Sequence, residues 1–368
     1  MRGSSIPGGL VAIDCEGPLT KNDNALELAT HFIPRGDRLF TQLSRYDDIL
    51  AFMVKRPGYR AGNTLKLICP FMRAFGVGNR EVIDFSAHHI LIMPGADTLL
   101  QWIAGHGHGF IISTSYRPYI RALCDAVGFP FRNTYCTDLD LEMVTPSGSE
   151  CREVRAMAER IIALPSLDWE PDVTSTEGLS REVRDAYASI DGMITGALPQ
   201  TTLGCFLEQV EPVGGEEKAK AVSDSCRRTG RHIAEVIYIG DSITDVEAFR
   251  LVREGGGMTV AFNGNRYALD NAEVACLAHH ADILALICQA FWERGRPGVE
   301  GLIAEWNSGS FSIDRVASDG LLGDTFEKRE RHHPSSMTFI SDKNRPSLIR
   351  ESETFRRQVR GEEIGRLG

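Results

Sequence analysis

The sequence predicts an α/β protein built on a doubly wound parallel sheet. Two short apolar runs, 11–13 and 236–239, each lead into acidic residues, which is typical of strands buried on both faces. A third apolar run, 110–112, lies between helical patterns at 96–104 and 117–127, and this helix–strand–helix order builds parallel sheets. The length of 368 residues allows such a core and one or two accessory modules.

Two stretches interrupt this core. Residues 21–91 have helical periodicity and no clear strand, so we expect a helical insertion after the first strand. Residues 137–202 are polar and helical, and we interpret them as a second, smaller insertion. The core is therefore expected to comprise residues 8–20, 92–136 and 203–295, followed by a polar, basic extension over 296–368.

The segment 203–295 alternates helical and strand patterns, as a parallel sheet requires. Helices are expected over 216–228, 246–253 and 282–292, and strands over 236–239 and 258–262. The strand at 110–112 is expected to stop at Ser113-Thr114-Ser115, before the helix over 117–127. After residue 295 the periodicity fades, so we expect the extension to lie outside the scaffold, with short helices near 300–306 and 348–360.

Composition narrows the class of protein. The formal net charge of −10 argues against a general nucleic-acid or anionic-membrane surface. Nine cysteines without Cys-x-x-Cys spacing argue against a disulfide framework and favour a reducing cytoplasm. The last 43 residues (326–368) differ, because ten Lys/Arg and seven Asp/Glu give a local charge of +3. This basic segment could dock a protein partner or be disordered.

Four acidic residues follow the predicted strands at 11–13 and 236–239. Asp14 and Glu16 follow the first strand, and Asp241 and Asp245 follow the second. If the strands are neighbours, these carboxylates meet at one sheet edge and raise each other's pKa values unless a cation lies between them. Hard oxygen ligands suit Mg²⁺, so we expect a Mg²⁺ site at these four residues, with Glu16 contributing its carbonyl.

These segments resemble the haloacid dehalogenase (HAD) superfamily, in its phosphoserine-phosphatase-like branch. Asp14-Cys15-Glu16-Gly17-Pro18 resembles the strand-one motif Asp-x-Asp-Gly-Thr, and Gly240-Asp241-Ser242-x-x-Asp245 resembles the last acidic motif. The strand ending at Ser113, and Lys218 at a helix start, match the two motifs between them. The resemblance covers most of 10–292 and implies a Rossmann-like core with a helical cap at 21–91. A weaker resemblance is to HAD-like proteins labelled subunit R of energy-converting hydrogenases.

The resemblance implies a Mg²⁺-dependent phosphomonoester hydrolase acting on a small phosphorylated metabolite. Asp14 is expected to form an aspartyl-phosphate, and Glu16 to protonate the leaving oxygen. Ser113 is expected to hydrogen-bond a phosphate oxygen, and Lys218 to neutralise the phosphoryl charge. Two assignments stay open, since Lys220 competes with Lys218, and Thr114 and Ser115 compete with Ser113.

The first motif departs from the family pattern at two positions. Glu16 stands where the family usually has Asp, so its longer side chain must fold back to keep the same reach. Pro18 stands in place of the usual Thr, which removes a hydroxyl and a backbone N–H just after the catalytic turn.

Three further residues are candidates for binding the substrate. Asp23 lies nine residues after Asp14, where phosphoserine-phosphatase-like relatives carry an acid that meets the substrate ammonium. The simpler interpretation of Asp23 is a helix N-cap or a solvated loop residue. Arg56 and Arg60 lie in one loop that could clamp an anionic substrate or form a surface turn.

Two other functions remain open at this point. A phosphotransferase would use the same aspartyl-phosphate but pass the phosphoryl group to an alcohol. A non-catalytic accessory subunit would keep the fold as a binding module. Packing four carboxylates together without a metal costs stability, which favours chemistry over a scaffold role.

Overall fold

The computed structural model describes residues 8–56, 59, 61–170, 173–312 and 323–365. Within these residues the strands form one seven-stranded sheet in the order β3-β2-β1-β4-β5-β6-β7. Neighbouring strands are parallel except β6 and β7, which are antiparallel. The strands are β1 (Leu10–Ile13), β2 (His108–Tyr116), β3 (Thr134–Thr137), β4 (Val236–Gly240), β5 (Met258–Phe262), β6 (Val274–Leu277) and β7 (Ser336–Phe339).

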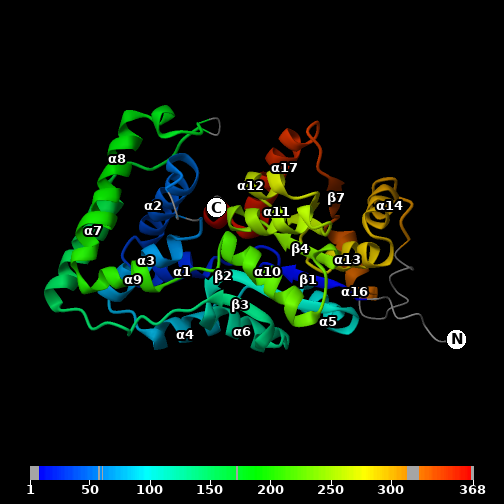
Figure 1. The fold of residues 1–368 in the computed structure, drawn as a ribbon, viewed down its shortest axis with the longest axis horizontal. Coiled ribbons are helices and arrows are strands. Elements are labelled where there is room, and N and C mark those ends of the chain that lie inside the picture. Colours follow the sequence, from blue (N-terminus) through cyan, green and yellow to red (C-terminus); the bar gives the residue numbers. More distant parts are fainter. Residues whose placement is uncertain (1–7, 57–58, 60, 171–172, 313–322, 366–368) are drawn as a thin grey trace.

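Helices cover both faces of the sheet, which confirms the predicted doubly wound α/β core (Figure 1). One face packs against α5 (Ala96–His106), α6 (Arg117–Val127), α13 (Ile283–Arg294) and α14 (Arg296–Asn307). The other face packs against α10 (Glu216–Thr229), α11 (Val246–Glu254), α12 (Arg266–Asn271) and α17 (Arg345–Arg360). Successive side chains of a strand point to opposite faces, and all four residues of β1 are fully buried.

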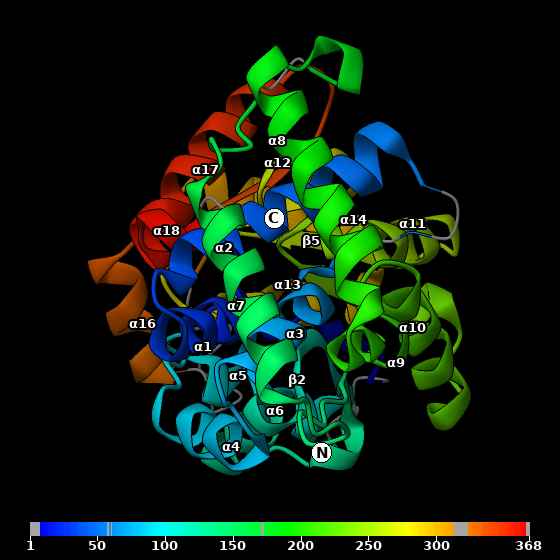
Figure 2. The ribbon, with the colours of Figure 1, turned by 90° about the vertical axis from the view of Figure 1, so that its left-hand side faces the viewer.

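The two predicted insertions form one helical module. Their apolar side chains belong to a single buried cluster that runs from Ala25 to Val210. Figure 1 shows this module beside the sheet, and Figure 2 looks onto its outer helices. Its elements are α1 (Asn24–Phe32), α2 (Gly36–Asp48), η1 (Ile49–Val54), α3 (Thr64–Ala74), α4 (Asn79–His88), α7 (Gly148–Ala163), α8 (Arg181–Asp191) and α9 (Phe206–Gln209). We call this module the cap; the residue limits predicted for its two parts stay predictions.

Gln42 of α2 joins the two parts of the cap. Its buried side-chain amide donates to the carbonyl of Pro165 at 2.9 Å, and its Oε1 accepts the backbone N–H of Leu167 at 3.1 Å. A second link lies nearby, where the Tyr46 hydroxyl donates to Asp191 at 2.6 Å. The second insertion is therefore held by polar contacts as well as by shared apolar packing.

The C-terminal extension was expected to lie outside the scaffold, and this prediction is wrong. β7 pairs with β6, and Phe326 of α16 (Gly323–His332) is fully buried in the core. α17 packs on the sheet, and α18 (Glu362–Gly365) follows it. The packing of α17 on the sheet could not be predicted from the sequence, because the buried face of this helix includes Ser352, Arg356 and Arg360. These residues break the apolar periodicity.

β2 continues through Ser113-Thr114-Ser115, the stretch at which this strand was expected to stop. β2 runs on to Tyr116, which pairs with Thr137 of β3 after a shift in register. The Tyr116 side chain is fully buried in the cap cluster, and its hydroxyl donates to the carbonyl of Leu65 at 2.5 Å. The additional residues of β2 thus connect the sheet to the cap.

In the described part of the chain, no helix combines the length and the apolar character that crossing a bilayer requires. All nine cysteines are free thiols.

We predict that Gln42→Ala destabilises the cap. The change leaves buried backbone groups near residues 165 and 167 without partners, at a cost of about 1–3 kcal/mol. Differential scanning calorimetry should show a lower Tm, and limited proteolysis should cleave the 137–202 segment faster. Gln200→Ala, at an exposed glutamine of the same segment, is the matched control. Equal stability of the two variants would contradict the role given to Gln42.

Candidate active site

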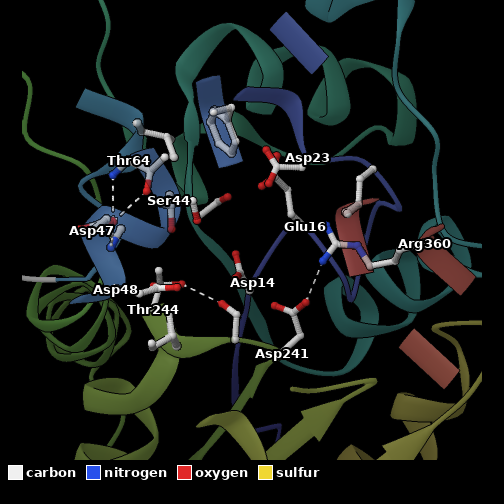
Figure 3. Close-up of a pocket in the computed structure, with 18 of the residues that line it drawn as sticks. Asp14, Glu16, Asp23, Ser44, Asp47, Asp48, Thr64, Asp241, Thr244 and Arg360 are labelled. Atoms are coloured by element: carbon white, nitrogen blue, oxygen red, sulfur yellow. Dashed lines mark hydrogen bonds and ion pairs between the residues drawn. The ribbon is translucent and has the colours of Figure 1, made fainter. Parts of the chain in front are cut away.

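The candidate site is a cavity of about 100 Å³ at the carboxyl end of the sheet, between α2 of the cap and α17 (Figure 3). Asp14, Glu16 and Asp241 come from the sheet edge, while Arg360 lies on one side and Asp47 on the other. The charged lining residues are Asp14, Glu16, Asp23, Asp47, Asp48, Asp241, Arg356 and Arg360.

Asp14 follows β1, an interior strand that pairs with both β2 and β4. Its backbone N–H donates to the carbonyl of Ile239 at 2.8 Å, so the parallel ladder places Asp14 beside the end of β4. Its Oδ1 accepts the N–H of Cys15 at 2.7 Å, and its Oδ2 lies 2.5 Å from Lys218 Nζ. Burial raises the pKa of Asp14, and the Lys218 ammonium opposes that rise.

Lys218, in the first turn of α10, is fully buried between two carboxylates. Its Nζ lies 2.5 Å from Asp14 Oδ2 and 2.7 Å from Asp245 Oδ1. Burial would lower the pKa of Lys218, but Asp14 and Asp245 together raise it above its usual range, so the amine stays charged. Lys220, in contrast, is exposed and pairs with Glu217 at 2.7 Å. The structure thus brings Lys218, and not Lys220, to Asp14.

Asp245 holds the lysine and the loop after β4 in place. Its Oδ1 accepts hydrogen bonds from Lys218 and from the Tyr238 hydroxyl at 2.7 Å. Its Oδ2 accepts the backbone N–H groups of Asp241 at 3.0 Å and Ser242 at 2.9 Å. Both carboxylate oxygens are therefore occupied, and we interpret Asp245 as a positioning residue.

Asp241 contacts two arginines that the sequence analysis missed. Arg356 Nη1 contacts Asp241 Oδ2, and Arg360 Nη1 lies 3.0 Å from the same oxygen. Both arginines are buried on one face of α17, four residues apart. The available signal was this spacing within a helix expected near 348–360, but no motif linked it to the acidic residues. Gly17 lies close by with φ +110°, and a Cβ there would lie 2.3 Å from Asp241 Oδ2.

The carboxylate oxygens of Asp14, Asp241 and Asp245 lie within 4.8 Å of one another. Lys218, Arg356 and Arg360 already face this cluster, so a metal would not be its sole counter-charge, as the sequence had led us to expect.

The donor set still fits Mg²⁺. Its ligands would be hard oxygens, and Asp241 Oδ1 accepts no hydrogen bond within the described residues. Asp14 and Asp241 both line the cavity, so they are the residues best placed to hold a metal ion.

Glu16 is the second acidic residue that follows β1. It lines the cavity beside Asp14, and one of its oxygens accepts the N–H of Asn24 at 2.8 Å. Burial raises the pKa of Glu16 to about 8, and the nearby Asp23 carboxylate adds to the rise. A carboxylic acid protonated near neutral pH can donate a proton to a leaving oxygen.

Ser113 lies in the irregular part of β2, between residues 112 and 116. Its Oγ accepts the N–H of Ser115 at 3.1 Å, and the side chain is buried. Ser113 and Thr114 both line the cavity, so the choice between them stays open.

The three predicted substrate residues have different surroundings. Asp23 lines the cavity and is also the N-cap of α1, since it accepts the N–H of Leu26 at 2.9 Å. Arg56 pairs with Asp191 at 2.8 Å inside the cap and does not line the cavity. Arg60 lies outside the described residues.

Two cap carboxylates at the end of α2 were not predicted. Asp47 Oδ2 accepts the N–H groups of Gly62 at 3.1 Å and Thr64 at 2.9 Å, and also the Thr64 hydroxyl at 2.9 Å. Asp48 is buried, and its ion-pair partner is Arg45 at 3.8 Å. Burial raises the pKa of Asp48 to about 7, although Arg45 lowers it.

These parts follow one another along the chain in a defined order. Asp14 directly follows β1, the cap begins soon after it, and Lys218 precedes β4, the neighbouring strand that leads into Asp241 and Asp245. This order of elements is the one that the sequence resemblance to the haloacid dehalogenase superfamily implied.

Comparison with solved structures supports a shared fold over the whole chain. A gene product from Archaeoglobus fulgidus has 27% sequence identity and a TM-score of 0.79, and the match covers 98% of this chain and 99% of that one. The shared fold therefore includes the C-terminal extension.

More distant structures also match. A phospho-aspartyl intermediate analogue of phosphoserine phosphatase has 11% identity and a TM-score of 0.45, covering 76% of this chain and 97% of that one. A HAD family hydrolase from Salmonella enterica serovar Typhi has 11% identity and a TM-score of 0.45, covering 77% and 72%. No family model and no curated protein matches the sequence.

We predict that Lys218→Met is strongly destabilising. The change leaves Asp14 and Asp245 buried without their shared cation, which typically costs about 3–5 kcal/mol. Urea unfolding monitored by circular dichroism should show the loss as a lower midpoint. Lys220→Met, at an exposed lysine two residues away, should leave the midpoint unchanged. A similar small effect in both variants would show that the buried pair contributes little.

We predict that Asp48→Asn stabilises the protein in a pH-dependent way. The pKa of Asp48 is raised in the folded state to about 7, so the folded state binds this proton more tightly than the unfolded state does. The stability that the protonated group contributes is therefore lost as pH rises from about 4 to about 7. The Tm of Asp48→Asn should exceed that of the wild type at pH 8, and the two should converge near pH 4. Asp125→Asn, at an exposed aspartate, should show no such difference.

Proposed function

We propose that this protein is a Mg²⁺-dependent phosphomonoester hydrolase that acts on a small phosphorylated metabolite through an aspartyl-phosphate at Asp14. The observation that carries the proposal is a row of three buried side chains, in which Lys218 contacts both Asp14 and Asp245. Asp14, the proposed nucleophile, lines the cavity. Phosphoryl transfer needs a positioned nucleophile and fixed positive charge. Asp14 offers the first and Lys218 the second.

The residues of the cavity suggest a two-step reaction. In the first step, a carboxylate oxygen of Asp14 attacks the phosphorus, the ester P–O bond breaks, and Glu16 gives its proton to the leaving oxygen. In the second step, Glu16 takes a proton from water while the water oxygen attacks the phosphorus. The P–O bond to Asp14 then breaks and releases phosphate. Lys218 neutralises charge near Asp14 in both steps.

A bound Mg²⁺ would supply further charge neutralisation on the phosphoryl oxygens. Asp14 and Asp241 are the residues proposed to hold it. Asp245 is proposed to act through Lys218 and the loop after β4, because both of its oxygens already accept hydrogen bonds.

The cavity supports a small substrate. Its volume is about 100 Å³, and cap residues Ser44, Asp47 and Thr64 form the wall opposite Arg360 (Figure 3). The leaving part of the substrate would contact this polar wall. A phosphotransferase would differ only in the acceptor, an alcohol in place of water, and the same wall would then bind that alcohol.

One observation favours a second candidate, a non-catalytic binding subunit. Lys218, Arg356 and Arg360 compensate the buried carboxylates with protein charges alone, so the cluster does not require a metal in order to be stable. Such a subunit would bind a phosphorylated ligand without cleaving it.

The first experiment is a phosphate-release assay on a broad panel of phosphorylated metabolites, with and without Mg²⁺. We expect Mg²⁺-dependent release by the wild type and a loss of about a thousandfold or more in Asp14→Asn, which removes the nucleophile. Asp125→Asn, at an exposed aspartate, is the matched control.

Two other outcomes would change the proposal. If no phosphate is released but calorimetry shows that Mg²⁺ binds, phosphotransfer becomes the better proposal. It would then be tested with alcohol acceptors. Absence of both release and Mg²⁺ binding would favour the binding subunit.

A further inference from the structure

We propose that Arg356 is an anion receptor of this site, which binds an oxyanion of the substrate through the Nε–Nη2 edge of its guanidinium. The inference rests on the proposed function, because it takes the cavity to be the place where a phosphorylated substrate binds. It assigns to α17 a direct part in recognition.

Arg356 is buried, but only one of its nitrogens is used by the protein. Nη1 contacts the Asp241 carboxylate, and it also donates to the carbonyls of Asp241 at 3.3 Å and Asn263 at 3.4 Å. Nε is buried without a hydrogen-bond partner, and Nη2 donates no hydrogen bond within the described residues. A buried charged donor without an acceptor is costly, so an unpaired Nε in a residue that lines the cavity points to a ligand.

Arg360 has the same charge and the same carboxylate partner, but all of its nitrogens are used. Nε donates to the carbonyl of Lys21 at 3.2 Å, and Nη2 donates to the carbonyl of Asn22 at 2.5 Å. Its Nη1 lies 3.0 Å from Asp241. Arg360 therefore holds α17 against the start of the cap, while Arg356 retains a free edge.

The local charge also favours an anion. Two guanidinium groups share one carboxylate oxygen of Asp241, so two cations meet one carboxylate at this point of a lining that is otherwise mostly acidic. The parallel N–H groups of Nε and Nη2 match the spacing of two oxygens in a phosphate or a carboxylate. The oxyanion has two sources in a phosphorylated metabolite, the transferring phosphoryl group or a second acidic group on the leaving part.

Calorimetric titration can test the receptor without turnover. All proteins would carry Asp14→Asn, and each would be titrated with inorganic phosphate, ethyl phosphate and phosphoglycolate. The last two are esters of similar size that differ by a carboxylate. Arg356→Gln should weaken binding by about tenfold or more, since a charge-assisted hydrogen bond is lost. Arg350→Gln, at an exposed arginine of the same helix, should bind as the background protein does.

The pattern of losses identifies the source of the oxyanion. Weaker binding of all three compounds would show that Arg356 contacts the phosphoryl group. Weaker binding of phosphoglycolate alone would show that it contacts a second acidic group. If Arg356→Gln does not fold, Arg356→Lys keeps a charge beside Asp241 but lacks the Nε–Nη2 fork, and it should show the same pattern. Unchanged affinity for all three compounds would overturn the inference.

This result is independent of the assay for hydrolysis. A protein that releases no phosphate but loses anion binding in Arg356→Gln would support the receptor and refute the hydrolase. A protein that hydrolyses phosphoesters but binds all three anions as well after Arg356→Gln as before would support the hydrolase and refute the receptor.

Discussion

The compensation of buried carboxylates by buried cations is the constraint on which the rest of this structure depends. Asp14, Asp241 and Asp245 lie together because two parallel strands end side by side at the centre of the sheet. Lys218 reaches them from α10, and Arg356 and Arg360 reach them from α17. The cations therefore come from segments far apart in the chain, and each segment must dock correctly for the acidic cluster to be tolerated.

This constraint gives the C-terminal extension its place. α17 buries polar and charged side chains where most core helices bury apolar ones, and Ser352 donates to the carbonyl of Gly264 at 2.5 Å. A helix docked through arginines can place positive charge beside a cavity in a defined geometry, because the guanidinium groups form directional bonds. The same residues that hold α17 in place thus shape the electrostatics of the site.

The sequence predicted the sheet, the cap and the acidic cluster because these depend on local patterns. The strands at 11–13 and 236–239 are apolar runs, and Asp14, Asp241 and Asp245 follow them directly. Arg356 and Arg360 could not be found in this way, since their partner lies 115 and 119 residues away in the chain. The union of the two insertions was missed for a similar reason. Gln42 contacts the backbone near residue 165, and neither segment reveals this contact by itself.

The bonds from Arg360 to Lys21 and Asn22 join residues 339 and 338 positions apart. During synthesis, the N-terminal strand and the cap leave the ribosome long before their partners on α17. The two arginines beside Asp241 are thus made after the other charged residues that line the cavity. Contacts between such distant parts of a chain also slow folding, because the loop between them must close first. The nascent chain therefore carries an acidic cluster that lacks two of its cations until α17 has been synthesised, so a nascent intermediate should differ in local charge from the chain in which α17 is docked.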